Sequence, residues 1–225
     1  LKVSGTTAAT GVTIGGLGNA AFAGSRVIGG NASLSTLAIG PGSGTATFSG
    51  ALGGAGTNEN QFNLEKTGAG TQILSGTTIT YAGTTTVREG TLQLGSTAVF
   101  APTGLLSVIA NAGTTAAFDF NGKSFATIGT LTLGGGASGQ AQVLDTNVTK
   151  GTLTLGGDIV YDASNNPGAA VISANLATGA RTITVNDSTN ATTDLTMSGT
   201  IAASGGITLA GAGNGAINGA WTLTG

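Results

Sequence analysis

Cysteine and histidine are both missing from this chain of 225 residues. The lack of cysteine excludes disulfides, thiolate nucleophiles and thiolate metal sites. The lack of histidine excludes Ser-His-Asp catalysis, histidine metal ligation and histidine acid–base chemistry. The most common hydrolase and metalloenzyme sites are therefore ruled out.

Charge is also scarce, because only 7% of the residues are charged and the formal net charge is −2. The seven cations are scattered, so we expect no nucleic-acid partner. No apolar run approaches the roughly 18 residues of a membrane-spanning helix, so we expect no membrane insertion by this segment. A charged and apolar leader is lacking as well, which predicts that residues 1–225 are a single segment of a larger secreted or surface protein.

Glycine supplies 42 residues, and 40% of the chain is hydrophobic while only 4% is aromatic. This composition predicts a folded chain whose interior is built from small aliphatic side chains. Threonine, serine and asparagine can hydrate the surface without charge, and β-branched threonine suits a strand. The composition is therefore typical of a β-protein.

Short runs that alternate apolar and polar residues recur between glycine, asparagine and serine, which predicts strands with one buried face. The heptapeptide GTLTLGG occurs at 129–135 and again, unchanged, at 151–157. We interpret the spacing of the two copies as one coil of a solenoid, so that each coil takes roughly 22 residues and the chain makes roughly ten coils. The predicted inward side chains include Leu131, Leu133, Leu153, Leu155, Ile183 and Val185, with Thr132 and Thr154 facing outward.

Residues 62–95 carry the best repeat match in the chain. They read FNLEKTGAGTQILSG and, after a short turn, YAGTTTVREGTLQLG. This stretch resembles the autotransporter-associated β-strand repeat, except that Gln72 and Ile73 replace the usual leucine and threonine and one extra residue precedes Tyr81. The resemblance implies a right-handed parallel β-helix, an all-β solenoid exported across the outer membrane and displayed on or released from a bacterial surface.

Nine carboxylates remain as candidates for chemistry. The closest pair, Asp158 and Asp162, would share one face of a strand but lie roughly 13 Å apart, beyond the spacing of glycosidase pairs. Most of the aspartates stand beside Asn, Gly, Ser or Thr and are interpreted as turn residues. We therefore predict no catalytic residue, no cofactor-binding residue, no metal site and no enzyme activity.

The sequence favours a non-enzymatic extracellular structural or adhesive scaffold, with an unidentified surface glycan or host or matrix ligand. One alternative is a filament subunit that self-associates through its terminal coils, because neither 1–5 nor 220–225 looks capped. Two further alternatives are a polysaccharide-acting β-helix enzyme and an ice-binding array. The array would use the Thr-x-Thr pairs at 45/47, 130/132, 152/154, 182/184 and 222/224.

Overall fold

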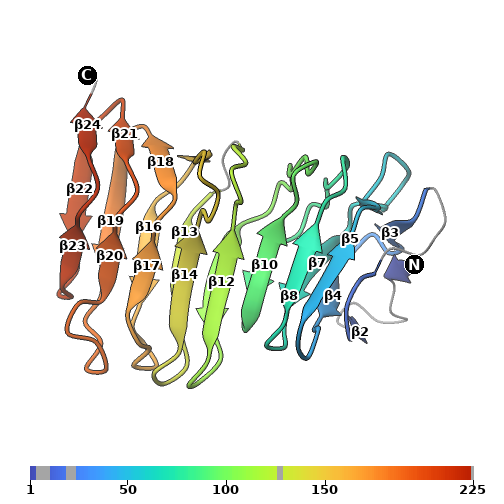
Figure 1. The fold of residues 1–225 in the computed structure, drawn as a ribbon, viewed down its shortest axis with the longest axis horizontal. Helices are drawn as coiled ribbons and strands as arrows, with labels where there is room; N and C mark the ends of the chain where they lie inside the picture. The colour runs from blue at the N-terminus through green and yellow to red at the C-terminus, as the bar shows by residue number, and fades with distance from the viewer. Residues whose placement is uncertain (4–10, 19–23, 126–128, 224–225) are drawn as a thin grey trace.

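The computed structural model describes residues 1–3, 11–18, 24–125 and 129–223 and contains only strands, turns and loops in these ranges. Every strand pair is parallel. The strands lie side by side along the long axis, and the two termini lie at opposite ends of the stack (Figure 1). The all-β solenoid predicted from the sequence is confirmed.

Each turn of the chain visits three faces in the same order. The first face is a nine-stranded sheet of β2 (Val12–Ile14), β4 (Ser35–Ile39), β7 (Phe62–Lys66), β9 (Thr85–Val87), β11 (Leu106–Ala110), β13 (Leu131–Gly135), β16 (Ile159–Asp162), β19 (Arg181–Val185) and β22 (Ile207–Ala210). The second is an eight-stranded sheet of β5 (Thr45–Phe48), β8 (Thr71–Leu74), β10 (Gly90–Leu94), β12 (Thr115–Asp119), β14 (Gln140–Leu144), β17 (Ala170–Ile172), β20 (Leu195–Met197) and β23 (Gly215–Ile217).

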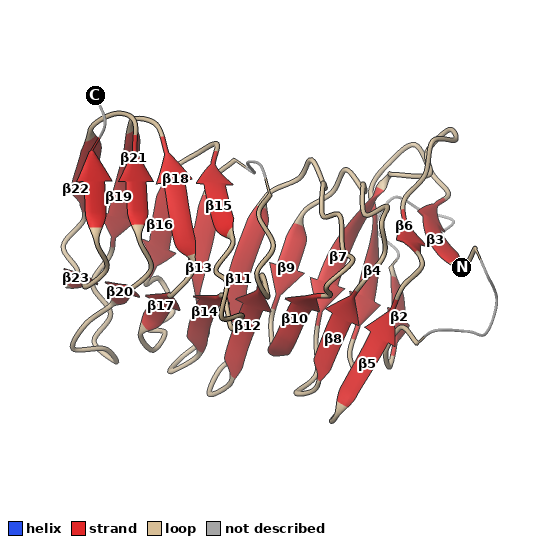
Figure 2. Ribbon diagram, turned by 45° about the horizontal axis from the view of Figure 1, so that its top comes forward, coloured by secondary structure: helices blue, strands red, loops and turns tan. Residues whose placement is uncertain are grey.

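The third face is divided into two sheets, which Figure 2 shows at opposite ends of the molecule. A three-stranded sheet holds β1 (Lys2–Val3), β3 (Arg26–Gly29) and β6 (Ala51–Leu52), and a four-stranded sheet holds β15 (Thr152–Leu155), β18 (Asn175–Thr178), β21 (Ile201–Ala203) and β24 (Trp221–Leu223). Between them, single bridges link Leu52 to Ile79, Ile79 to Phe100, and Phe125 to Leu153.

Aromatic rings fill the core where the third face lacks long strands. The ring centroid of Phe125 lies 5.2 Å from that of Phe100 and 4.9 Å from that of Phe120, both in edge-on contacts. Phe118 packs against the same group. Edge-on contact is favourable between aromatic rings, so this cluster supplies bulk that small aliphatic side chains would not.

Elsewhere the interior consists of side-chain ladders that run from coil to coil. Along the nine-stranded sheet, Leu106, Leu131, Ile159 and Ile183 stack in register. All six side chains predicted to face inward are at most 7% exposed, whereas Thr132 is half-buried and Thr154 is exposed. The predicted inward and outward assignment is therefore confirmed.

The interpretation of the heptapeptide spacing as one coil is wrong. The two identical copies lie on different faces, because the first forms β13 of the nine-stranded sheet and the second forms β15 of the third face. Leu131 instead pairs with Ile159, which lies beyond the end of the second copy. Coil length also varies, from a short coil in which Thr71 pairs with Thr91 to a long one in which Gln142 pairs with Val171. The chain makes about eight turns rather than ten.

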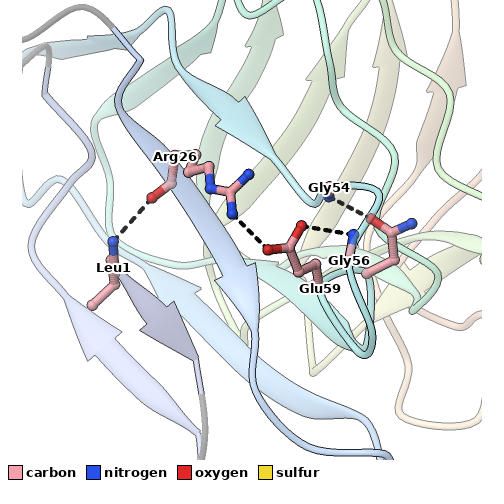
Figure 3. A network of polar contacts seen from close by, with 6 residues as sticks. Leu1, Arg26, Gly54, Gly56 and Glu59 are labelled. Carbon is pink, nitrogen blue, oxygen red and sulfur yellow. Dashed lines mark hydrogen bonds and ion pairs between the residues drawn. The ribbon is translucent and has the colours of Figure 1, made fainter.

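Polar contacts tie the first coils together on the third face (Figure 3). The Arg26 guanidinium forms an ion pair with Glu59, with 2.5 Å between Nη2 and Oε1. The other oxygen of Glu59 accepts a hydrogen bond from the amide of Gly56, and Asn60 accepts one from the amide of Gly54. The loop between β6 and β7 is thus held against β3.

Candidate functional site

A buried lysine organises the corner between β7 and β8. Lys66 occupies an inward ladder position between Ile39 and Val87, where its side chain is 0% exposed. Its ammonium donates hydrogen bonds to the carbonyl oxygens of Thr67, Gly68 and Glu89, at 2.7, 2.6 and 2.9 Å. The ammonium therefore ties one corner to the corner of the next coil.

Burial lowers the pKa of Lys66 from 10.5 to about 8, and the nearby Glu89 carboxylate acts in the opposite direction. Sequence reasoning did not single out Lys66, although a signal was present. The alternation that places Phe62 and Leu64 inward also places Lys66 inward, and a lysine at an inward position needs acceptors for its ammonium.

This corner and the corresponding corner of the next coil each contain a glycine in a left-handed backbone conformation. Gly68 has a φ of 73° and Gly90 a φ of 64°. A Cβ atom on Gly90 would lie 2.4 Å from the carbonyl oxygen of Gly70 in the preceding coil. The KTGAG and REG sequences thus encode corners in which successive coils approach one another closely.

Gln72, the first departure from the usual repeat, faces the interior and is 0% exposed. It occupies a ladder position between Ala46 and Leu92. Its carboxamide bonds the backbone of Leu17, far earlier in the chain, through one N–H and one carbonyl contact of 2.9 Å each. Ile73 points outward and is half-buried.

The aspartates act mainly as acceptors for backbone amides at the corners, as predicted for turn residues. Asp145 accepts hydrogen bonds from Gly122, Asn147 and Gly151, and Asp194 accepts them from Ser188 and Asn214. Both carboxylates are at most 2% exposed. The corners therefore use negative charge to satisfy amides that would otherwise lack partners.

Asp119 connects three coils on the outer side of the eight-stranded sheet. It accepts hydrogen bonds from the Gln93 amide, the Thr146 hydroxyl and the backbone amides of Asn121 and Thr146. Burial alone would raise the pKa of Asp119, but these four hydrogen bonds outweigh it and lower the pKa below its usual value of 3.8. Asp119 is therefore held in its charged form.

The pair considered for glycoside chemistry occupies structural positions. Asp158 precedes β16 and accepts a hydrogen bond from the amide of Thr182 in the next coil, while Asp162 ends β16 and accepts one from Ser164. No group of three or more metal-ligating side chains occurs in the described ranges. Nor does the described part of the chain contain a helix long and apolar enough to cross a membrane.

The threonine pairs are spread over all three faces. Thr45 and Thr47 lie on β5, Thr182 and Thr184 on β19, and Thr152 and Thr154 on β15. Thr132 lies on β13, with Thr130 directly before that strand, and Thr222 lies on β24, while Thr224 is outside the described residues. In the described ranges the pairs therefore do not gather on one sheet.

The described part of the chain contains hollows in which a ligand could sit, and two of them are relevant here. The first, which we call the Ala117 hollow, is an open depression of about 440 Å³ on the outer side of the eight-stranded sheet, lined by residues that include Glu89, Thr91, Thr115, Ala117 and Gln142. It exists because Ala117 is in register with the larger Thr91 and Gln142 on the neighbouring strands.

The second hollow, of about 190 Å³, opens at the C-terminal end of the coil interior. Ile183, Val185, Leu195 and Met197 line it, together with Leu209 and Ile217 of the last coil. Leu209, Trp221 and Leu223 continue the inward ladders here but are 60%, 44% and 61% exposed. The apolar core is thus open to solvent at this end.

The stacked parallel coils and their glycine corners define the class of this protein as a repetitive β-solenoid. Within that class, residues 64–94 match the passenger-associated-transport-repeat family, so the chain carries a repeat of the autotransporter passenger type. The match coincides with the stretch singled out from the sequence, which confirms that prediction. It includes Lys66, Gln72 and Gly90. Neither a curated protein nor a solved structure matches the chain.

Proposed function

We propose that this chain is a non-enzymatic structural or adhesive scaffold outside the bacterial cell, a passenger-type segment displayed on or released from the surface. The observation that carries the proposal is the passenger repeat at residues 64–94 within a continuous solenoid. The family is one of passenger repeats and not a catalytic family. The buried charged groups Lys66, Asp119, Asp145 and Asp194 all serve coil corners.

Location is tested on intact cells of the source bacterium. We expect antibodies raised against the 225-residue chain to label unpermeabilised cells, or to detect the protein in the medium. Protease added to intact cells should remove the cell-bound signal while a cytoplasmic marker persists. Labelling that requires permeabilised cells would contradict the proposal.

Enzyme activity is tested with the purified chain and a panel of pectins, alginates and glucans. We expect no release of reducing ends or unsaturated products. The matched variants are Asp158→Asn and Asp162→Asn, because these residues form the closest carboxylate pair in the sequence and were expected on one strand face. Turnover by the unmodified chain that either variant abolishes would overturn the non-enzymatic assignment.

For the adhesive role, the lining of the Ala117 hollow includes one uncharged amide, three hydroxyls and one carboxylate, from Gln142, Thr91, Thr114, Thr115 and Glu89. These groups suit the hydroxyl-rich surface of a glycan. A glycan array probed with the chain and with Gln142→Ala tests this role. Binding that falls in the variant supports adhesion through the hollow, whereas binding unchanged in the variant, or none, contradicts it.

A second candidate function is self-association, the first step towards a filament. The observation that favours it is the exposure of Leu209, Trp221 and Leu223 at the C-terminal end. A second copy of the chain is a suitable partner, because residues 195–225 contain no charged residue that would repel it.

A further inference from the structure

Within the described ranges, the eight-stranded sheet begins one coil later than the nine-stranded sheet. Each turn passes through the nine-stranded, eight-stranded and third faces in that order. Between β2 and β3 this order calls for a strand beside β5, yet within the described ranges the sheet ends at β5. Residues 15–18 occupy that place in the chain.

Residues 15–18 lie against the inner side of β5. Leu17 is only 7% exposed and belongs to the hydrophobic core. A Cβ atom on Gly16 would lie 3.4 Å from the Cβ atom of Ala46 and 3.5 Å from that of Pro41. Ala46 faces inward and is in register with Gln72. The backbone at Gly16 therefore lies across the N-terminal end of the coil interior.

Gln72 holds this segment from two strands away. Its Oε1 accepts a hydrogen bond from the Leu17 amide at 2.9 Å, and its Nε2 donates one to the Leu17 carbonyl at 2.9 Å. The carboxamide thus presents to Leu17 the same donor and acceptor pair that a neighbouring strand would present. Nε2 also lies 3.1 Å from the carbonyl oxygen of Ala46, which leaves room for it because its side chain is a single methyl group.

A buried carboxamide without hydrogen-bond partners destabilises the fold, so an inward glutamine is tolerated only where suitable partners exist. Nε2 finds acceptors on β5 and β8 as well, in the carbonyl oxygens of Ala46 and Ile73 at 3.1 and 3.2 Å. Within the described ranges, however, the donor to Oε1 is the amide of Leu17. The replacement of the usual leucine by Gln72 therefore has a structural reason at the N-terminal end of the ladder.

We propose that Gly16 and Leu17 form an end cap that closes the coil interior at β5, and that Gln72 is the residue that anchors this cap. Repeat proteins need atypical terminal units because a regular unit leaves its strand edges and core open to other chains. The cap covers the inner edge of the ladder that starts with Ala46, Gln72 and Leu92.

The test is amide hydrogen exchange in the full 225-residue chain and in Gln72→Leu, which restores the usual residue of the repeat. We expect the Leu17 amide to exchange about tenfold faster or more in the variant, because about 1.4 kcal/mol of protection corresponds to a factor of ten. Exchange at Val108 and Leu133 should stay unchanged, since both lie in a ladder of the nine-stranded sheet that does not contain Gln72. Gln142→Leu, on the outer side of the same sheet, is the matched control and should leave Leu17 protected.

Gln72→Met is a second variant of similar length that cannot accept or donate these hydrogen bonds. It keeps the proposal testable if the branched leucine disturbs the fold, and retained protection at Val108 and Leu133 reports an intact solenoid. Faster exchange confined to residues 11–18 in either variant supports the cap. Wild-type exchange at Leu17 in a folded Gln72→Met chain would overturn it.

Discussion

At the scale of single residues, the solenoid separates core from surface within each short strand. Leu153 is 0% exposed on β15 and its neighbour Thr154 is exposed. Alternation fixes this difference, because successive side chains of a strand point to opposite faces. The favourable free energy of burial therefore comes mainly from every second residue of a strand.

This difference gives a matched pair of variants. Leu153→Ala should lower the free energy of unfolding by about 2 to 5 kcal/mol, because it removes buried methyl groups and leaves a cavity. Thr154→Ala should change it by about 0.5 kcal/mol or less. Urea denaturation of both variants measures the difference, and equal losses would contradict the assignment of faces.

Lys66 makes stability depend on pH. Its pKa in the folded chain, about 8, lies below the 10.5 of an exposed lysine, so burial disfavours its charged form. The unfolded chain therefore holds the proton more tightly than the folded chain at mildly alkaline pH. It follows that the free energy of unfolding should increase as the pH rises from about 8 towards 10.

Measurements of this slope should stop near pH 10. Burial raises the pKa values of Tyr81 and Tyr161 above 10.0, and ionisation of these tyrosines in the unfolded chain then favours unfolding. Lys66→Met is the control, because it cannot titrate. A slope between pH 8 and 10 that persists in Lys66→Met would assign the effect to another group.

At the scale of strands and corners, close approach between coils depends on glycine. Gly90 combines a φ of 64° with a Cβ position 2.4 Å from the Gly70 carbonyl oxygen, whereas a Cβ atom on Gly179 would meet no atom within 4 Å. We expect Gly90→Ala to lower the thermal midpoint, at a cost of about 1 to 3 kcal/mol. Gly179→Ala should leave the midpoint nearly unchanged, and comparable shifts in the two variants would refute the argument.

The sequence predicts strands and faces more reliably than it predicts coil length. The alternation in Thr130–Leu133 is local, so it correctly predicts which side chains face inward. The length of a coil depends instead on the corners, which range from tight glycine turns to longer loops such as 145–151. Two identical heptapeptides could therefore fall on different faces, because each encodes a strand and neither encodes the corner that follows it.

The contacts of Gln72 and Lys66 show a second limit of sequence reasoning. The alternation places both side chains in the interior. It does not identify the Glu89 carbonyl as an acceptor of Lys66, nor Leu17 as the partner of Gln72. These partners lie in other coils, and which residues meet there depends on how the coils stack. The aspartates were predicted correctly as turn residues because their partners include nearby amides of the same corner, as in Asp145 with Asn147.

At the scale of the whole molecule, the two ends differ. The first coil carries the cap at Leu17, while the last coil exposes Leu209, Trp221 and Leu223 around the C-terminal hollow. The cap covers one of the three faces at the N-terminal end. The C-terminal end has a free strand edge on each of its three faces, at β22, β23 and β24, and can pair with the C-terminal end of a second chain. We therefore expect the isolated chain to associate through its C-terminal ends and to stop at a dimer.

Light scattering and electron microscopy over a range of concentrations measure this association. Leu223→Lys places a charge on the exposed inward ladder and should yield monomers, and Thr222→Pro should act similarly by removing a backbone donor from β24. Thr196→Lys, which faces outward on the preceding coil, is the control and should still dimerise. Concentration-independent monomers would exclude association, and long filaments would show that the N-terminal end also accepts a partner.

The register of the strands has a mechanical consequence. Strand pairing in the described ranges joins each coil to its two neighbours, and a whole turn of the chain separates two residues that stack directly, as it separates Thr71 from Thr91 and Gln142 from Val171. A pulling force on the two ends would therefore load the terminal coils first and detach them one after another. Each detached coil would release roughly 70 to 100 Å of extended chain in place of a strand spacing of about 4.8 Å. Such a rod would lengthen in steps under tension, while the coils not yet reached keep their ladders intact.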